Sequence, residues 1–420
     1  MKRILLFLVL ITCMVSMVFA AGSKEDVSTV TKGTEISFWN GFTASDGDIL
    51  REIFDRFNAE NPQDIKVDMD IMPWANMLEK LAVSVSTKTG PTLILLGLEN
   101  IPEYSESGAL LSLNDFWEWS GLDKENYSPN VLKAFQYNNN TYGIPMQYNS
   151  HYLYWNKDLF KEAGLDPEKP PKNFSEFIEY AERLSDPTKE QYGYAFAADS
   201  AVITNFLWSN GGDWLTADNT KSAINSPEAI QVFKMFQDFS KNKISPTGMT
   251  GADLDNLFYA GKVAMYINGP WLIAGCREKG IDFGIGSIPA SDSGNKEFIG
   301  TGVAFMITSS ATEEQKIAAY EVIKYWLSKN ILKEWTLRNG FPAWSQEVLD
   351  DPEVQKNLIQ SELGTITQYT RVPFEGLPES TQILSDYVNP ILEQLTYLKI
   401  SPSEAAEKME EGINKVLKNR

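Results

Sequence analysis

The fold is decided by the stretch of sequence that begins with EISFW at residues 35–39 and ends with LILL at residues 93–96. Between these strand-like segments, apolar residues recur at helical spacing from Ile49 to Phe57 and then alternate with polar residues over 65–71. Strands that alternate with helices in this way are typical of an α/β domain with a mostly parallel sheet. In such domains ligands bind beyond the carboxyl ends of the strands.

The same alternation resumes near residue 149 and predicts a second α/β region. The expected strands are 152–155, 192–198, 262–267, 283–288 and 302–308, and the expected helices are 174–184, one that starts at 226–228, one after 312–315 and one after 401–404. TEEQ at 312–315 and SPSE at 401–404 match the capping-box pattern, which marks the start of a helix. The sequence shows no internal repeat.

Composition excludes several classes of protein. The 420 residues include 37 Lys and Arg against 56 Asp and Glu, a formal net charge of −19. Binding to phosphate groups needs clustered basic residues, so this balance argues against a nucleic-acid partner and against an anionic-membrane surface. Hydrophobic residues make up 43% of the chain, which is enough for large cores and argues against intrinsic disorder.

Cysteine and histidine are too scarce for several kinds of site. Two cysteines provide neither a disulfide scaffold nor a multi-thiolate zinc site, and a single histidine excludes a His-rich metal cluster. Catalysis by a Ser/His/Asp or Cys/His arrangement would depend on His151 alone. The sequence contains no GxxxxGK(S/T) phosphate loop and no GxGxxG motif between a strand and a helix. We therefore expect neither a cofactor nor a metal site.

The N-terminus predicts export. Two basic residues precede an apolar run over 4–18, and Ala20 offers a small residue for signal peptidase, so residues 1–20 are expected to be a signal peptide. The run is shorter than the roughly 20 residues that span a bilayer, which argues against a membrane anchor. Cys13 lies inside the run, so lipid anchoring is not favoured. Cleavage would give a net charge of 35 − 56 = −21 to a protein of the periplasm or the extracytoplasmic membrane face.

Tryptophans stand beside turn residues near the ends of several expected strands. They are Trp39, Trp74, Trp271 and Trp344, which adjoin Asn40-Gly41, Pro73, Gly269-Pro270 and Pro342. The alternative for each is burial in a core, because an aromatic ring buries a large apolar area. On a strand-end loop, an aromatic face can instead stack against the C–H face of a sugar ring.

Polar side chains that can bond sugar hydroxyls occupy similar positions. The candidates are Asn40, Glu99, Asn100, Gln147, Asn149 and His151. Arg371 could clamp a hydroxyl pair or a carboxylate with two hydrogen bonds. The alternatives are a structural, hydrogen-bonded role for His151 and a surface ion pair for Arg371. Stacking rings combined with amides and carboxylates are the chemistry of carbohydrate recognition.

Six motifs together resemble the family 1 extracellular solute-binding proteins of ABC sugar importers, the maltose-binding-protein-like group. They are WNG (39–41), FNAENP (57–62), YGIP (142–145), YWNKDLF (154–160), NGGD (210–213) and MYINGPW (265–271). The likeness extends from about residue 34 to residue 417. The NKDLF and INGPW segments are its most specific parts.

The resemblance implies a two-lobed periplasmic-binding-protein fold of type II, in which each lobe is a mostly parallel sheet flanked by helices. The chain would make three hinge crossings between the lobes, near residues 148, 302 and 336. Lobe 1 would comprise 34–148 and 303–335, and lobe 2 would comprise 149–302 and 336–420. Closure of the hinge would bury a sugar in the cleft and present both lobes to an ABC transporter permease.

The resemblance also implies roles for individual residues. Trp271 would stack on a sugar ring, and Glu99 would bond sugar hydroxyls. The family commonly has an acid after YGIP, where this chain has Gln147, with His151 nearby. This departure bears on which sugar is bound and not on the class of protein.

Gly211 and Gly302 would allow close approach of the backbone to the ligand. The expected protein is a monomer that captures its ligand reversibly and is not an enzyme. Three alternatives stay open. A secreted glycosidase would need two acids that flank one bond at roughly 5 to 9 Å. The solute could be a glycerol phosphate or a polyol, and the protein could signal rather than import.

Overall fold

The computed structural model describes residues 32–43, 45–357, 360, 363–364, 366 and 369–418. The expected signal peptide over 1–20, with Cys13, lies outside the described residues. Within the described part of the chain, no helix is both long and apolar enough to cross a membrane.

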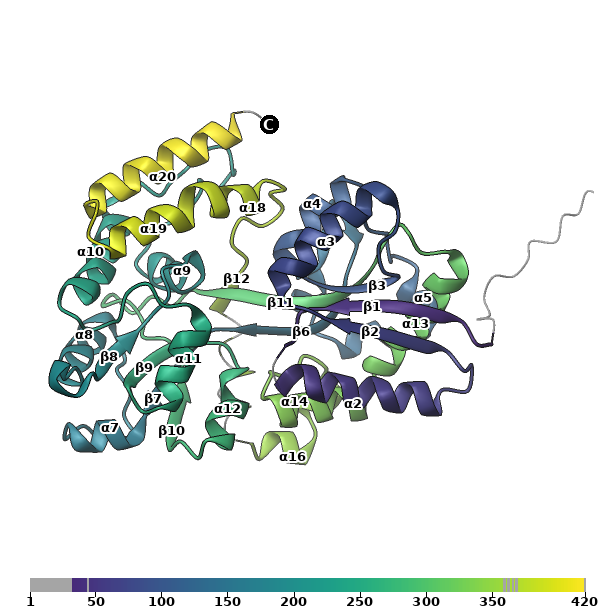
Figure 1. Cartoon of the computed structure of the whole chain (residues 1–420), viewed down its shortest axis with the longest axis horizontal. Helices are drawn as coiled ribbons and strands as arrows, with labels where there is room; N and C mark the ends of the chain where they lie inside the picture. The colour runs from purple at the N-terminus through teal and green to yellow at the C-terminus, as the bar shows by residue number, and fades with distance from the viewer. Residues whose placement is uncertain are drawn as a thin grey trace, which may run out of the picture.

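The chain forms two α/β lobes that lie end to end along the long axis of the molecule, each with its own buried core (Figure 1). Lobe 1 contains β1 (Glu35–Asn40), α2 (Ser45–Glu60), β2 (Lys66–Ile71), α3 (Trp74–Thr87), β3 (Leu93–Gly97), η1 (Leu98–Asn100), α4 (Ile101–Glu106), α5 (Phe116–Ser120), η2 (Lys124–Asn126), α6 (Pro129–Ala134), β4 (Gln136–Tyr137), β5 (Asn140–Thr141), β6 (Ile144–Ser150), α13 (Glu313–Trp326), α14 (Lys329–Asn339), α15 (Gln346–Leu349) and α16 (Pro352–Gln355).

Lobe 2 contains β7 (Tyr152–Asn156), α7 (Lys157–Glu162), α8 (Phe174–Arg183), η3 (Pro187–Lys189), β8 (Tyr192–Ala195), α9 (Ser200–Ser209), α10 (Pro227–Lys241), α11 (Gly251–Tyr259), β9 (Val263–Asn268), α12 (Leu272–Glu278), β10 (Phe283–Gly286), α18 (Ser380–Ile383), η5 (Leu384–Val388), α19 (Asn389–Thr396) and α20 (Pro402–Leu417). Two further strands, β11 (Phe298–Ile307) and β12 (Thr370–Arg371), lie where the lobes meet. The two-lobed α/β architecture predicted from the sequence is confirmed.

The sheet of lobe 1 has six strands in the order β12-β11-β3-β1-β2, and β6 also pairs with β11. β1 runs parallel to β2 and β3, so the alternation of strands and helices over 35–96 produces the parallel pairing that the sequence predicts. β11 is antiparallel to both β3 and β6. The carboxyl ends of β1 and β3 point toward lobe 2 (Figure 1), which places the loops after them at the junction between the lobes.

The sheet of lobe 2 has the order β10-β7-β9-β8 and differs from the prediction of a mostly parallel sheet. Only β8 and β9 are parallel among its described pairs, whereas β7 is antiparallel to β9 and to β10. Strand and helix alternation in the sequence does not determine strand order. β7 enters lobe 2 directly from β6, and β9 and β10 are placed on either side of it.

The chain passes between the two cores three times. The last core residue on one side and the first on the other are Tyr148 and Tyr152, Ile299 and Ala304, and Val354 and Leu363. The third passage therefore lies later than the expected position near residue 336. Phe341, Trp344 and Val348 are buried in the core of lobe 1, because α14 packs on α2 and carries the following short helices with it.

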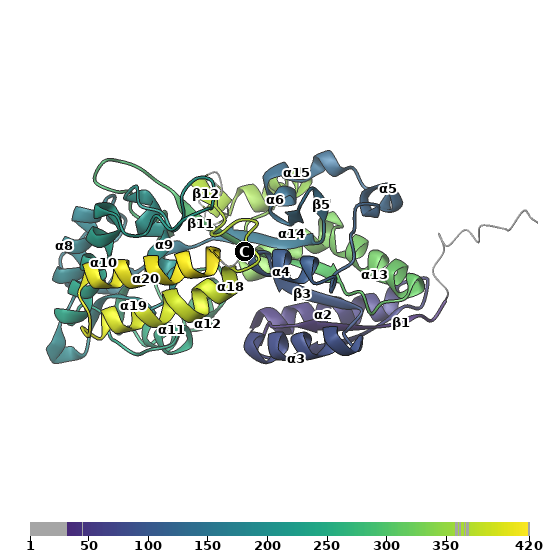
Figure 2. The ribbon, with the colours of Figure 1, turned by 90° about the horizontal axis from the view of Figure 1, so that it is seen from above.

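The two predicted capping boxes have different outcomes. At the start of α13, Gln315 N donates to Thr312 Oγ1 (3.2 Å) and Thr312 N donates to Gln315 Oε1 (3.1 Å), so this box is complete. At the start of α20, Glu404 N donates to Ser401 Oγ (3.2 Å), but the Glu404 carboxylate forms an ion pair with Lys408 (3.0 Å). That cap is therefore only half of a box. α20 lies on the outer side of lobe 2, packed against α10 and α19 (Figures 1 and 2).

Candidate functional site: a cleft between the lobes

A cleft of about 550 Å³ separates the lobes and is lined by both of them. Its walls include residues of both lobes and of β6 and β11, which we call the crossing strands because they run from one lobe to the other. Lobe 1 contributes Gly41, Phe42, Thr43, Asp46, Trp74, Asn339 and Phe341, and lobe 2 contributes Asp255, Asn256, Tyr259, Trp271, Gly275, Glu278 and Lys279. The crossing strands contribute Gln147, Asn149, Thr301, Gly302 and Val303. Aromatic, amide and carboxylate side chains thus converge in one concave space, which is the usual form of a small-molecule site.

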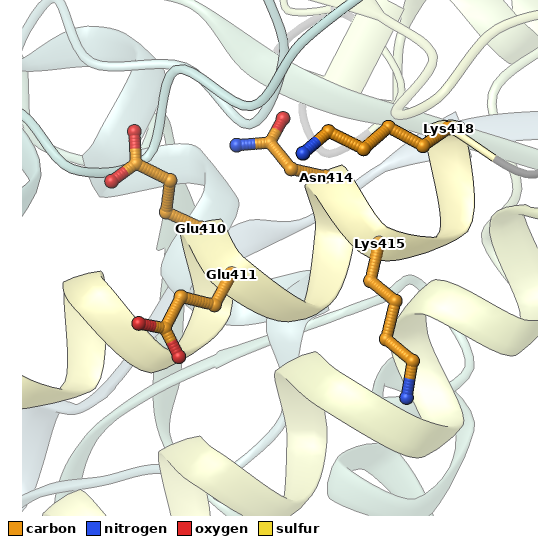
Figure 3. A pocket seen from close by; sticks show the side chains of 5 residues that line it. All are labelled: Glu410, Glu411, Asn414, Lys415 and Lys418. Carbon is orange, nitrogen blue, oxygen red and sulfur yellow. The ribbon is translucent and has the colours of Figure 1, made fainter.

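Another recess, on the surface of α20, has a different character. It is lined only by Glu410, Glu411, Asn414, Lys415 and Lys418, all from one helix, whose side chains spread away from one another (Figure 3). These are the solvated polar residues of an amphipathic helix whose other face is buried. The interlobe cleft is therefore the candidate functional site.

Trp271 forms the aromatic wall on the side of lobe 2. It follows β9 and precedes α12, and 39% of its surface is exposed. A Cβ on Gly269 would lie 2.0 Å from Trp271 Cζ3, so only glycine lets the indole fold back over this turn. The indole meets the His151 ring edge-on at 6.1 Å between centroids.

Trp74 forms the aromatic wall on the side of lobe 1. It begins α3, and its ring meets Phe42 edge-on at 5.7 Å between centroids. A Cβ on Gly41 would lie 2.1 Å from Trp74 Cδ2, so the indole lies directly over the glycine that follows β1. Each lobe therefore brings one half-covered tryptophan to the cleft.

The crossing strands form the floor of the cleft. Gln147 is buried and its Oε1 accepts a hydrogen bond from Trp335 Nε1 (2.9 Å), which fixes the orientation of its amide. Asn149 Nδ2 donates to the Ser150 carbonyl (3.1 Å). A Cβ on Gly302 would lie 2.5 Å from the Gln147 carbonyl oxygen, so this glycine is needed for the pairing of β6 with β11.

Five of the thirteen candidate residues named from the sequence thus line the cleft, namely Trp74, Gln147, Asn149, Trp271 and Gly302. Two other predicted tryptophans do not. Trp39 and Trp344 are only 7% and 6% exposed and belong to the core of lobe 1. Lys80 Nζ covers the Trp39 ring at 3.8 Å, and Trp344 packs on Tyr127 at 5.2 Å between centroids.

Arg371 and Gly211 serve lobe 2 rather than the cleft. The Arg371 guanidinium is ion-paired with Asp213 and with Glu297 Oε1 (3.3 Å), and it lies 4.1 Å from the centre of a Trp208 ring. This is the ion-pair alternative that the sequence analysis left open. Gly211 has a φ of +89°, which provides the turn after α9.

The polar residues at the ends of β1 and β3 bond their own loops. Asn40 Oδ1 accepts a hydrogen bond from Phe42 N (3.2 Å), and Asn40 is fully buried. Glu99 Oε1 accepts from Asn100 Nδ2 (3.1 Å), and the Glu99 carbonyl accepts from Ser380 Oγ of α18 (3.4 Å). None of these three predicted residues lines the cleft, because these bonds fold the strand ends onto themselves.

His151 lies at the first passage between the lobes and is buried behind Trp271. Its Nδ1 lies 3.5 Å from Asn205 Nδ2, and burial lowers the pKa of its imidazole to about 4. The ring is therefore neutral at neutral pH, when it supports Trp271 from the side. It does not line the cleft itself.

Two further polar residues, Asp255 from lobe 2 and Asn339 from lobe 1, line the cleft and were not predicted from the sequence. Asp255 Oδ1 accepts hydrogen bonds from Tyr266 OH (2.9 Å) and Asn268 Nδ2 (2.7 Å), and burial raises the pKa of its carboxyl to about 6. Asn339 ends α14, and its buried Nδ2 has no hydrogen-bond partner in the described part of the chain. The only available signal was the Asn339-Gly340 pair, which marks a helix end and says nothing about a binding role.

Among the described residues, no group of three or more His, Cys, Asp or Glu side chains is arranged to hold a metal ion. The chemistry that the cleft offers is hydrogen bonding and stacking.

Comparisons with known proteins show similarity in fold and in sequence. An ABC transporter solute-binding protein of Thermotoga lettingae, bound with α-D-tagatose, matches with a TM-score of 0.83 at 23% identity over 91% of this chain and 100% of that chain. The galactooligosaccharide-binding protein of Bacillus subtilis is 24% identical over 407 residues, 93% of this chain and 92% of that protein. The maltotriose-binding protein of Pyrococcus abyssi is 24% identical over 339 residues, 80% of this chain and 72% of that protein.

These likenesses confirm the predicted two-lobed fold of the maltose-binding-protein type. Residues 52–359 match the family of bacterial extracellular solute-binding proteins. The matched segment starts in α2 of lobe 1, includes the lobe 2 elements up to β10, and ends after α16 of lobe 1. Because this match covers well over half of the chain, the protein belongs to the bacterial extracellular solute-binding proteins.

Proposed function

We propose that this protein captures a carbohydrate in the interlobe cleft and delivers it to the membrane permease of an ABC importer. The observation that carries the proposal is the placement of Trp271, a large and partly exposed aromatic ring on a cleft wall opposite Trp74. Relatives named for maltotriose and galactooligosaccharide binding support it. Stacking on sugar rings and hydrogen bonding to hydroxyls would supply the affinity.

The direct test is Trp271→Ala, measured by isothermal titration calorimetry with maltotriose, galactotriose and tagatose. We expect the variant to lose about 1 to 3 kcal/mol of binding free energy for the sugar that binds, because a central aromatic anchor is removed. Tyr397→Ala is the matched control, since Tyr397 is 41% exposed but lies outside the cleft. Equal affinities of Trp271→Ala and the wild type would show that Trp271 does not contribute to binding.

Delivery to a permease implies capture and release without chemistry. Incubation of the protein with each sugar should therefore leave the sugar intact by chromatography, while the sugar raises the melting temperature by mass action. Release of shorter sugars would instead support a glycosidase. We infer further that residues 1–20 are removed on export. The mass of the exported protein in mass spectrometry should then equal that of a chain that begins at Ala21.

A further inference from the structure

The charges on the cleft walls are unbalanced. Among the described residues that line the cleft, the charged side chains are three carboxylates, Asp46, Asp255 and Glu278, and a single cation, Lys279. Lys279 Nζ lies 3.2 Å from Glu278 Oε1, so that cation already has a carboxylate beside it. Arg371, which could have clamped an anion, is held by Asp213 and Glu297 in lobe 2. The lining carboxylates outnumber the lining cation, so a phosphate or carboxylate ligand would meet more negative than positive charge in this cleft, which is unfavourable.

Asp255 presents one carboxylate oxygen that its neighbours do not use. Both of its hydrogen bonds, from Tyr266 OH and from Asn268 Nδ2, go to Oδ1. Within the described residues, Oδ2 accepts none. β9 supplies both donors, so the carboxylate is held at a fixed orientation on the wall of lobe 2 while one oxygen stays available to a hydroxyl donor.

Asn339 presents a donor with no acceptor on the opposite wall. The residue lines the cleft, is 2% exposed, and its Nδ2 has no hydrogen-bond partner among the residues that the structure describes. A buried amide N–H left unpaired costs folding free energy that a ligand oxygen can recover on binding. A sugar carries both kinds of group, because each hydroxyl donates one hydrogen bond and accepts others.

We propose that Asp255 and Asn339 are a specificity-determining pair across the cleft, which bonds the hydroxyls of an uncharged sugar and excludes its phosphorylated form. Asp255 accepts a hydroxyl hydrogen from the side of lobe 2, and Asn339 Nδ2 donates to a sugar oxygen from the side of lobe 1. The proposal rests on the proposed function, namely that a carbohydrate binds in this cleft.

The test is calorimetry on the full-length protein with maltotriose, galactotriose and tagatose, each paired with its own 6-phosphate ester. We expect the wild type to bind a neutral sugar at least about tenfold more tightly than the ester. Asp255→Asn keeps an oxygen that can accept from Tyr266 and Asn268. It should weaken binding of the neutral sugar about tenfold and reduce the ratio of the affinity for the neutral sugar to the affinity for its ester. Glu411→Gln removes one charge on α20 (Figure 3), outside the set of residues that line the cleft, and should change neither the affinity for the neutral sugar nor its ratio to the affinity for the ester.

Asn339→Leu supplies an independent measurement. The substitution replaces the amide by an apolar side chain of similar size, so the melting temperature of the ligand-free protein should not fall. The affinity for the neutral sugar should decrease at least about fivefold. If a neutral sugar binds but both variants match the wild type, or if the ester binds as tightly, this inference is overturned and the proposed function stands. If none of the three neutral sugars binds, both this inference and the proposed function are contradicted.

Discussion

Asp255 makes the stability of the folded protein depend on pH. Burial raises the pKa of this carboxyl from 3.8 to about 6, so the folded protein holds the proton more tightly than the unfolded chain does. Its contribution to stability is complete below about pH 4 and is lost as the pH rises through 6. The free energy of unfolding of Asp255→Asn, minus that of the wild type, should therefore rise by about 2 to 3 kcal/mol when the pH is raised from 4 to 7.

Urea unfolding at the two pH values measures this difference, and subtracting the wild type at each pH cancels the other titrating groups. Glu411→Gln is the control, because its carboxylate lies on the surface of α20. A difference between Asp255→Asn and the wild type that stays constant from pH 4 to pH 7 would show that Asp255 titrates as an ordinary surface acid.

The site could be predicted from the sequence only as far as residue type. Trp39, Trp271 and Trp344 all stand beside turn residues, and their local sequences do not distinguish them. Trp271 is left partly exposed by the glycine beneath its ring, whereas Trp39 is covered by Lys80 and Trp344 by Tyr127. Those covering side chains come from other elements, so tertiary packing and not local pattern decides which ring reaches the cleft.

At the scale of elements, one side chain contacts three neighbouring strands, β6, β11 and β12. Tyr148 of β6 lies over Gly300 of β11, where a Cβ would be 2.1 Å from the Tyr148 hydroxyl, and that hydroxyl lies 3.0 Å from Thr370 Oγ1 of β12. Only a residue without a side chain at 300 lets the three strands meet in this way. This contact adds to the backbone pairing of β11 with β6 and with β12, at the place where the two lobes meet.

We expect Gly300→Ala to destabilise the protein by about 1 to 3 kcal/mol, because the methyl group would displace the Tyr148 ring and break its bond to Thr370. Removing the hydroxyl in Gly300→Ala/Tyr148→Phe should recover part of the loss, which a double-mutant cycle of thermal unfolding measures. Gly251→Ala, at the start of α11 with nothing within 4 Å of an added Cβ, is the matched control. Additive losses in the cycle would mean that the two residues do not act on each other.

The elements themselves were more predictable than their grouping. Spacing alone located β1, α2, β2 and β3 to within a few residues, because each buries one face with a clear period. The third passage between the lobes was placed too early. The apolar residues over 341–354 belong to the core of lobe 1 through the packing of α14 against α2, a tertiary contact that their local sequence does not indicate.

At the scale of the whole molecule, a ligand held by both walls favours a closed arrangement of the lobes. We expect saturating sugar to reduce the radius of gyration in small-angle X-ray scattering. The concentration at half effect should match the calorimetric dissociation constant and shift with it in Trp271→Ala. Heat of binding without any change in scattering would show that capture occurs without closure.

β11 also has a consequence for how the protein is made. Its first residues pack in the core of lobe 2, and its last residues pair with β3 and β6 in lobe 1. The sheet of lobe 1, whose first strand begins at residue 35, is therefore incomplete until β12, at residues 370–371, has been synthesised, and the core of lobe 1 needs residues up to Val354. Lobe 2 in turn needs α20, at the end of the chain. We therefore expect neither lobe to complete its core until most of the chain has been synthesised, so that a nascent chain shows no protected lobe 1 before that point.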